Sequence, residues 1–152
     1  IDEEREFAPI DLNRVLTEEA DTIATAHDAV TVETDLPADL WVEADNLIYQ
    51  LFSNLFQNAV FHNDVEGLVI DVEATRNGDS VEIVVADNGT GIPPDVSERC
   101  FELGEGGPES DGDGIGLYLV SRLAEVYGGA VKLGRSPAGG AQFTVSIPAT
   151  AP

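Results

Sequence analysis

The spacing of apolar and polar residues predicts three main helices along this chain. In each of them apolar side chains recur every three or four positions, which is the repeat of one helix face. The three segments are residues 12–26, 45–63 and 114–127, and Asp45 is expected to cap the second of them. A shorter helix is expected between residues 93 and 101.

Short apolar runs between these helices predict strands. Asn77-Gly78 separates two such runs, which is a strong signal for a hairpin. Helices segregated on one side of such strands predict an α/β fold, a two-layer sandwich with a mixed, mostly antiparallel sheet and helices on one face. The chain is long enough for one domain and too short for two, so a single domain over residues 1–152 is expected. The predicted strands cover residues 30–34, 40–42, 69–76, 80–86, 131–133 and 142–147.

Polar residues interrupt the apolar face of the long helix at 45–63. Asn54, Asn58 and His62 fall at the same helical angles as Leu47 and Leu51, which are expected to face the core. Buried carboxamides need hydrogen-bond partners. They form either a satisfied network in the core or the wall of a pocket, where two amides one turn apart can hold a hydrated Mg²⁺.

Three glycine-rich segments follow that helix. Glycine lets the backbone approach a ligand closely, and a helix that begins at such a loop favours phosphate. A phosphate-binding loop of the G-x-x-x-x-G-K-[ST] type is absent, and the G-x-G-x-G spacing does not match a dinucleotide fingerprint. The pattern still predicts a nucleotide site. The segments are Asp87-Asn88-Gly89-Thr90-Gly91, Gly112-Asp113-Gly114-Ile115-Gly116-Leu117 and Gly139-Gly140.

Asp87 ends an apolar run and precedes Asn88-Gly89, which allows two interpretations. An aspartate in this setting commonly forms an Asx turn with its own backbone. A carboxylate at the end of a buried strand can also accept a hydrogen bond from the exocyclic amine of a nucleotide base, which would give base selectivity. In that case Gly89 and Gly91 would let the backbone close over the purine.

The chain carries 29 acidic residues against 7 Lys+Arg, a net charge of −22. This surface makes nucleic acid an improbable partner, because binding it depends on cations. The long apolar runs argue against acidic disorder. A folded protein adapted to concentrated salt explains the charge better, since the Debye length falls to about 3 Å at 1 M salt. The composition therefore indicates a halophile's cytoplasm.

The location of the protein is indicated by what the sequence lacks. No run approaches the length of a membrane span, and no signal-peptide pattern opens the chain. The lone Cys100 forms no internal disulfide, which fits a reducing cytosol. We expect a cytoplasmic domain without membrane insertion of its own, tethered to a membrane sensor if the full-length protein has one. Because Met is absent, Ile1 is expected to lie inside a longer protein.

The ordered set of motifs resembles the ATP-binding domains of sensor histidine kinases. Their wider GHKL family also includes type II topoisomerase, heat-shock chaperone and mismatch-repair ATPases. The resemblance covers about residues 10–148 and implies the Bergerat fold. The matching segments are Asn54-Leu55-Phe56-Gln57-Asn58-Ala59, Asp87-x-Gly89-x-Gly91-Ile92-Pro93, Phe101, Gly112-x-Gly114-Ile115-Gly116-Leu117 and Gly139-Gly140-Ala141-Gln142-Phe143.

The resemblance also implies roles for individual residues. ATP would lie between the long helix and a lid at about 102–112. Asn58, with Asn54, would ligate Mg²⁺, and Asp87 would bind the adenine amine. Phosphates would be contacted where the last helix begins, at Gly112, Gly114 and Gly116. The other residues of the implied ATP site are Ala59, Phe61, His62, Gly89, Gly91, Ile92, Phe101, Asp113, Ile115 and Leu117.

Some positions depart from the family pattern. Phe61 stands where a basic residue is common, and Arg99 is the nearest cation to the lid phenylalanine. Asn54 occupies the position of the glutamate that serves as general base in the hydrolytic members of the family. An amide cannot take a proton from water, so steady ATP hydrolysis is not expected.

These features predict the catalytic domain of a protein-histidine kinase of haloarchaeal type. Mg-ATP would donate its γ-phosphoryl group to a histidine on an adjacent dimerisation helix, expected upstream of Ile1, and a response regulator would receive it next. Neither His27 nor His62 has the flanking sequence of that acceptor, so no catalytic residue of certain role lies in the chain. Two alternatives remain open, a regulatory ATP-binding module without kinase activity and an ATPase clamp, which Asn54 disfavours.

Overall fold

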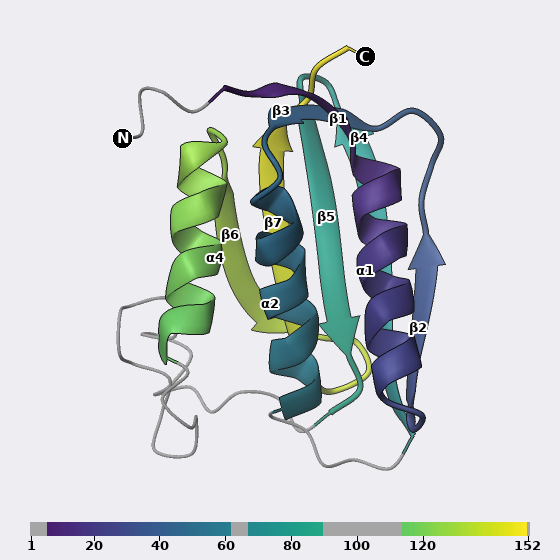
Figure 1. Cartoon of the computed structure of the whole chain (residues 1–152). Coiled ribbons are helices and arrows are strands. Elements are labelled where there is room, and N and C mark those ends of the chain that lie inside the picture. Colours follow the sequence, from purple (N-terminus) through teal and green to yellow (C-terminus); the bar gives the residue numbers. More distant parts are fainter. Residues whose placement is uncertain (1–5, 62–66, 90–113, 152) are drawn as a thin grey trace.

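A computed structural model of the protein describes residues 6–61, 67–89 and 114–151, and it consists of a β-sheet layer and a helix layer (Figure 1). In chain order the elements are β1 (Ala8–Asp11), α1 (Leu12–Ala26), β2 (Val30–Asp35), β3 (Trp41–Ala44), α2 (Ile48–Phe61), β4 (Leu68–Asn77), β5 (Ser80–Asp87), α4 (Gly114–Val126), β6 (Ala130–Arg135) and β7 (Ala141–Pro148). The predicted short helix at 93–101 and the predicted lid at 102–112 lie outside the described residues.

The main sheet has five strands in the order β2-β4-β5-β7-β6. β2 runs parallel to β4, and the other neighbours in this sheet pair antiparallel. The mixed, mostly antiparallel sheet with helices on one face is therefore confirmed. The predicted strand at 40–42 also forms, as β3, but it pairs with β1 in a separate two-stranded sheet.

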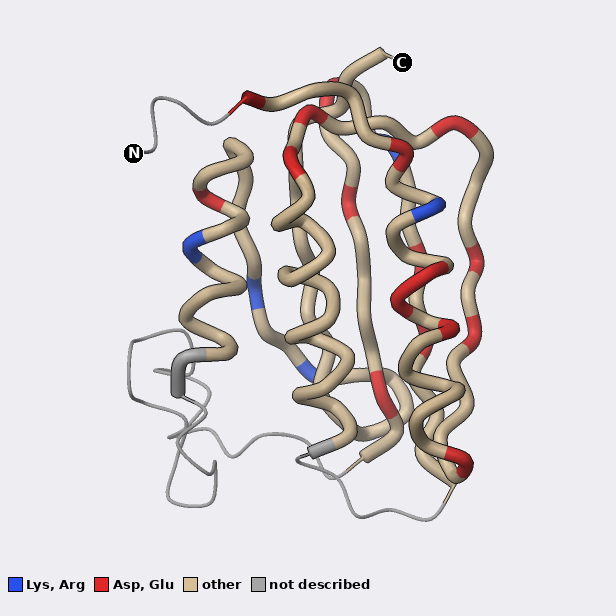
Figure 2. Tube along the Cα trace, in the orientation of Figure 1, with Lys and Arg blue, Asp and Glu red and all other residues tan. Residues whose placement is uncertain are grey.

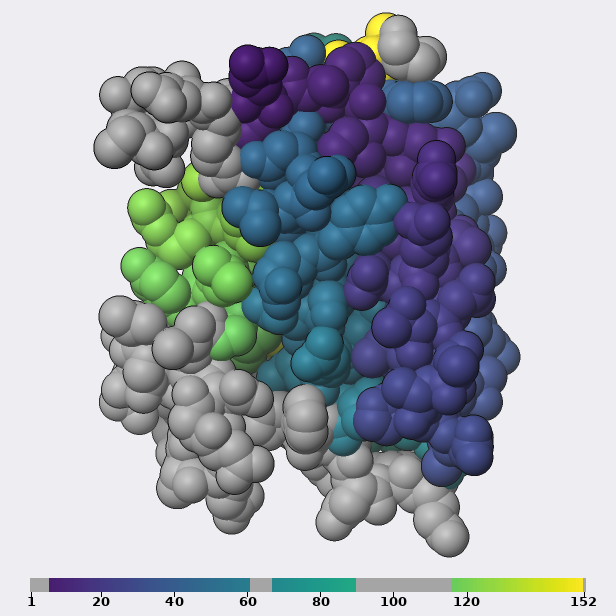
Figure 3. All heavy atoms as spheres, in the orientation of Figure 1, coloured from purple at the N-terminus to yellow at the C-terminus, as the bar shows by residue number. Residues whose placement is uncertain are grey.

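Helices α1, α2 and α4 lie side by side over one face of the main sheet and close it off in the space-filling view (Figures 1 and 3). Side chains along β4, β5 and β7 alternate between the two faces of the sheet, and every second one enters the core beneath the helices. The largest fully buried side chains include Phe52 and Phe56 of α2 and Ile70, Ile83 and Ile147 of the sheet. Burial of this apolar layer is what holds the helices on the sheet.

The long helix forms, but it begins at Ile48, three residues later than predicted, and its buried face starts there. Asp45 Oδ1 accepts a hydrogen bond from Leu47 N at 3.2 Å, and Asp45 O accepts one from Ile48 N. The buried stripe starts at Ile48 and continues through Leu51 and Leu55. The prediction that Leu47 faces the core is wrong, because Leu47 precedes the first helical residue and its side chain is 48% exposed.

The predicted hairpin is confirmed. β4 and β5 pair from Asn77↔Ser80 at the turn to Ile70↔Asp87 at the other end. Gly78 has a φ of +62°, a conformation that glycine adopts without steric cost. The hairpin carries Asp87 to the edge of the sheet that lies farthest from the turn.

Acidic residues gather on α1, β2 and the neighbouring strand (Figure 2). On the sheet face away from the helices, Glu33 is the register partner of Asp71, and Asp35 is the partner of Glu73. Adjacent strands are about 4.8 Å apart, so these like charges repel at close range. Part of the negative charge is thus concentrated in one region of the sheet.

Candidate nucleotide-binding site

Four elements bring predicted site residues to one end of the molecule. β5 ends there at Asp87, α2 ends there at Phe61, α4 begins there at Gly114, and β7 begins there at Ala141. Figure 1 shows these four ends together at the bottom of the view. Segments far apart in the sequence therefore meet at a single edge.

Asp87 is buried at this edge, with 5% of its surface exposed. Its Oδ1 accepts a hydrogen bond from Gly89 N at 2.9 Å, which is the contact of an Asx turn. The same oxygen accepts a second bond from Ala141 N at 3.2 Å, across to the start of β7. The Asx-turn interpretation is confirmed, and the turn also holds the carboxylate against the neighbouring strand.

Gly140 lies directly against that carboxylate. A Cβ atom built on Gly140 would be 2.0 Å from Asp87 Oδ1, 2.5 Å from Asp87 O and 2.6 Å from Gly89 N. No side chain fits at such distances, so only glycine lets β7 come this close to the Asp87 loop. The Gly139-Gly140 pair is visible in the sequence, but its contact with Asp87 is not.

Asn88 holds the other side of the same loop. Its Oδ1 accepts from Val69 N at 2.8 Å, and its Nδ2 donates to Gly67 O at 3.3 Å. Asp87 and Asn88 thus tie the end of β5 to β7 and to β4, one on each side. Asn88 was missed as a site residue because the tie depends on a contact 19 residues away along the chain.

Asn54 connects α2 to the first turn of α4. Its Nδ2 donates to Gly116 O at 3.2 Å, and its Oδ1 accepts from Gln50 Nε2 at 2.7 Å. A carbonyl can only accept, so the Gly116 contact fixes which end of the Asn54 amide is oxygen. The Asn54 amide is thus satisfied at both ends, by one half-buried and one exposed contact, and the Gly116 contact joins two elements of the predicted site. Gln50 is exposed, and the sequence did not indicate it as the partner of Asn54.

The remaining predicted residues are only partly described. Asn58 is half-buried on α2, Ala59 and Leu117 are buried, and Gly116 is half-buried at the start of α4. Phe61 is the last residue of α2, while Gly114 and Ile115 are the first two of α4. The predictions for His62, Gly91, Ile92, Phe101, Gly112 and Asp113 lie outside the described residues.

The protein groups predicted to ligate a metal suit an ion that is held mainly by water and phosphate oxygens. Within residues 6–61, 67–89 and 114–151, no three His, Cys, Asp or Glu side chains come together as a metal-binding cluster. The predicted metal ligands Asn54 and Asn58 offer neutral amide oxygens. Mg²⁺ accepts such a sparse set when waters and phosphate oxygens complete its shell.

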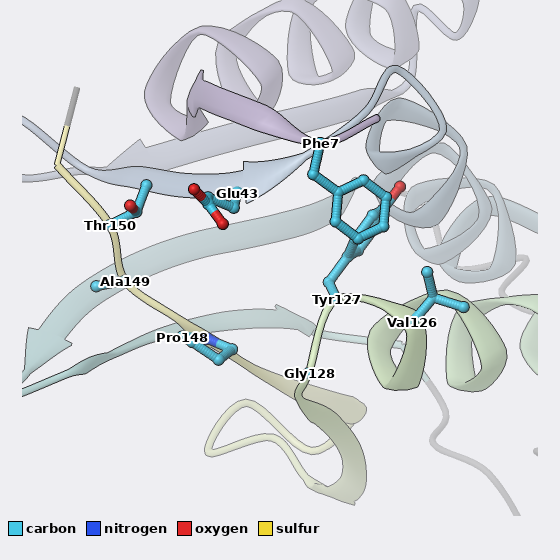
Figure 4. A pocket seen from close by; sticks show the side chains of 8 residues that line it. All are labelled: Phe7, Glu43, Val126, Tyr127, Gly128, Pro148, Ala149 and Thr150. Carbon is cyan, nitrogen blue, oxygen red and sulfur yellow. The ribbon is translucent and has the colours of Figure 1, made fainter. Parts of the chain in front are cut away.

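A shallow cavity of about 310 Å³ lies at the opposite end of the sheet (Figure 4). Phe7 and Tyr127 line it, with ring centroids 5.4 Å apart at an interplanar angle of 63°. Tyr127 follows the end of α4, so this cavity is remote from the edge where α4 begins.

Among the described residues, no helix is long and apolar enough to cross a membrane.

Comparison with known proteins gives consistent matches. A family model described as histidine kinase-, DNA gyrase B- and HSP90-like ATPase matches residues 43–151. The sensor-like histidine kinase SenX3 of Mycobacterium tuberculosis is 30% identical over 148 residues, covering 92% of this chain and 36% of SenX3. The alginate biosynthesis sensor protein KinB of Pseudomonas aeruginosa is 34% identical over 148 residues, 94% of this chain and 25% of KinB. The chain thus spans about a third of the length of SenX3.

Solved structures match over nearly the whole chain. The catalytic domain of histidine kinase ThkA has a TM-score of 0.84 at 25% identity, covering 95% of this chain and 96% of that domain. Full-length ShkA in complex with AMPPNP has a TM-score of 0.83 at 30% identity, covering 98% of this chain and 32% of ShkA. The chain belongs to the histidine kinase-, DNA gyrase B- and HSP90-like ATPase family.

Proposed function

We propose that this chain is the ATP-binding catalytic domain of a sensor histidine kinase. The observation that carries the proposal is the buried Asp87 carboxylate, held at a strand end beside the edge where α4 begins. A carboxylate there can accept from the adenine amine, and a helix N-terminus favours phosphate. The similarity to ShkA, which was solved with AMPPNP, supports the same assignment.

Mg²⁺ is the proposed cofactor, with Asn58 and Asn54 as its protein ligands. When bound, the ion supplies charge that offsets the triphosphate. Asn54 keeps its amide nitrogen on Gly116 O, and its oxygen, which also accepts from Gln50 Nε2, would ligate the ion through its other lone pair. This chain's residues would therefore position ATP and orient its phosphates, and Asn54 offers no general base.

In the intact protein, the proposed reaction transfers the γ-phosphoryl group to a histidine on an adjacent dimerisation helix. A response regulator is the proposed later acceptor. We propose that residues 1–152 form one domain, with a lid at about 102–112 and with the dimerisation domain upstream. Catalysis by such a domain consists of positioning and charge stabilisation.

Incubation with ATP labelled at the γ-phosphate tests this function. The kinase assignment predicts label on the histidine of the dimerisation segment when this domain and that segment are present together. The domain alone is expected to bind Mg-ATP and to release almost no phosphate, because Asn54 cannot act as a base. An Asn58→Ala variant should bind ATP without dependence on Mg²⁺.

Other outcomes of the same experiment identify the alternatives. Rapid release of phosphate by the domain alone would assign an ATPase clamp. Binding of Mg-ATP without transfer to the segment would assign a regulatory nucleotide module. Unchanged Mg²⁺ dependence in Asn58→Ala would move the metal to other ligands.

Adaptation to high salt, as in a haloarchaeal cytoplasm, is a separate proposal. The net charge of −22 and the facing pairs Glu33↔Asp71 and Asp35↔Glu73 support it. Salt screens such repulsion, so the thermal midpoint should rise between about 0.1 and 1 M KCl, as the Debye length falls from about 10 to 3 Å. A midpoint that stays flat over this range would contradict the proposal.

A further inference from the structure

We propose that Gly140 and Ala141 are positioning residues that set the purine selectivity of the site by holding Asp87 in one orientation. The inference rests on the proposed function, in which Asp87 reads the base. Neither residue needs to touch the nucleotide, since both act through the carboxylate.

Ala141 supplies the first part of this arrangement. The register between β5 and β7 runs up to Ala86↔Gln142, so Ala141 is one step beyond the last backbone pair. Its N–H donates to Asp87 Oδ1 at 3.2 Å. The ladder is thus extended by a side-chain carboxylate in place of a backbone carbonyl, which locks the carboxylate to the end of β7.

Gly140 supplies the second part, because it leaves room for the carboxylate. A Cβ atom built on Gly140 would lie 2.0 Å from Asp87 Oδ1. A Cβ atom built on Gly134 in β6 would meet nothing within 4 Å. The requirement for glycine at 140 is therefore local and not a general property of this part of the sheet. Any side chain at 140 would push the Asp87 loop away from β7.

The orientation of the carboxylate matters because of the chemistry of the two purines. Adenine carries an amino group at C6, which donates to a carboxylate. Guanine carries a carbonyl at the same atom, which a carboxylate repels. With Oδ1 held by Gly89 N and Ala141 N, the buried carboxylate cannot swing aside to admit guanine.

Gly140→Ala tests the proposal, with Gly129→Ala as the matched control. The control introduces an equally severe contact, with Cβ 1.7 Å from Ser146 O, but at the other end of β6 and β7. Both variants should lower the unfolding midpoint. Only Gly140→Ala should reduce the ratio of ATP to GTP affinity, by about tenfold or more, the scale of a buried polar group left without its partner. Calorimetry with ATP and with GTP measures the ratio.

Ala141→Pro provides a second test that depends less on steric disruption. Proline removes the N–H that reaches Asp87, and the first residue of a strand tolerates it. Ala130→Pro, at the first residue of β6, is the matched control. The selectivity ratio should fall in Ala141→Pro, by more than in Ala141→Val, which adds volume and keeps the N–H. It should not change in Ala130→Pro.

Asp87→Ala separates this inference from the proposed function. If Asp87→Ala leaves the ATP to GTP ratio unchanged, Asp87 is not the base reader and both proposals lose their support. If Asp87→Ala removes the selectivity while folded Gly140→Ala and Ala141→Pro retain it, only the positioning role is overturned. Equal loss of selectivity in Gly140→Ala and Gly129→Ala would also overturn it, since the effect would then be one of general stability.

Discussion

Two aspartates at opposite ends of the molecule show two uses of a carboxylate. Asp45 lies where α2 begins, and its Oδ1 accepts from the Tyr127 hydroxyl at 2.6 Å and from Leu47 N at 3.2 Å. Asp87 lies where β5 ends. The two donors described above for its Oδ1 are both backbone N–H groups, those of Gly89 and Ala141. Asp45 is half-buried, while Asp87 is buried.

The difference between these partners indicates different roles. Asp45 fastens the start of α2 to the residue after α4, so the carboxylate stabilises the helix layer. Asp87 is instead fastened by backbone N–H groups, one in its own loop at Gly89 and one at the start of β7 at Ala141, so the backbone positions the carboxylate. A group that the fold holds in a fixed orientation is suited to bind a ligand. Substitutions at the two ends should therefore separate binding from stability.

Replacing Asp87 should have the largest effect on binding. Asp87→Asn puts an amide donor where the adenine amine needs an acceptor, and the affinity for ATP should fall by about 1–3 kcal/mol, roughly 5- to 150-fold. Asp45→Asn should leave that affinity nearly unchanged. Isothermal calorimetry on both variants makes the comparison. Equal losses in the two variants would remove the distinction between the two aspartates.

Replacing Asn88 should affect stability at the site end. Asn88→Ala removes the acceptor for Val69 N and the donor to Gly67 O, so the free energy of unfolding should fall by about 1–3 kcal/mol. Amide hydrogen exchange at Val69 should become faster, because this N–H loses its partner. Unchanged exchange at Val69 would show that the side chain does not hold the start of β4 in solution.

Removal of the Tyr127 hydroxyl tests the opposite end. Tyr127→Phe leaves Asp45 without one donor, and we expect a loss of about 0.5–1.5 kcal/mol of stability without a change in ATP affinity. Tyr49→Phe is the control, because the Tyr49 hydroxyl donates to the exposed Glu18 at 2.6 Å and should matter less. Denaturant unfolding of both variants gives the difference. A weaker binding of ATP by Tyr127→Phe would show that the two ends are coupled.

The sequence was sufficient for the parts of the fold that depend on local pattern. The helices at 12–26 and 114–127 and the Asn77-Gly78 hairpin were predicted within a residue or two. The Asx turn at Asp87 was also predicted, since an aspartate at the end of an apolar strand followed by Asn-Gly is a local signal. Local pattern failed for Leu47, because a residue just before the helix does not follow its periodicity.

Long-range contacts explain what the sequence did not reveal. Ala141 N reaches Asp87 across 54 residues, and Asn54 reaches Gly116 across 62. Nothing in the spacing of residues along the chain encodes these distances. The roles of Gly140 and Asn88 could therefore be assigned only after the strands had been placed side by side.

Glu19 is a third carboxylate, and burial acts on it more strongly than its hydrogen bond does. Burial on α1 raises the pKa of Glu19, a hydrogen bond with Ser53 partly offsets this, and the nearby charge of Glu18 raises it further. A raised pKa in the folded state means that folding favours the protonated acid. The contribution of Glu19 to stability is therefore fully present below the pKa of the unfolded chain and is lost as the pH rises through the folded-state pKa.

Replacing Glu19 should consequently have the smallest effect on the free energy of unfolding, and it should raise that free energy where the other substitutions lower it. Glu19→Gln is neutral at every pH, so at neutral pH it should unfold slightly less readily than the parent chain, by about a few tenths of a kcal/mol, since water still screens this half-buried group. The gain should vanish at acidic pH, where the parent's Glu19 is protonated. Asp21→Asn, at an exposed acid on the same helix, is the control for the loss of one charge from the net −22. Denaturant unfolding from acidic to neutral pH measures the gain in stability. A gain that persists at acidic pH would contradict the role of Glu19 burial. A gain that Asp21→Asn matches would assign the effect to general charge repulsion.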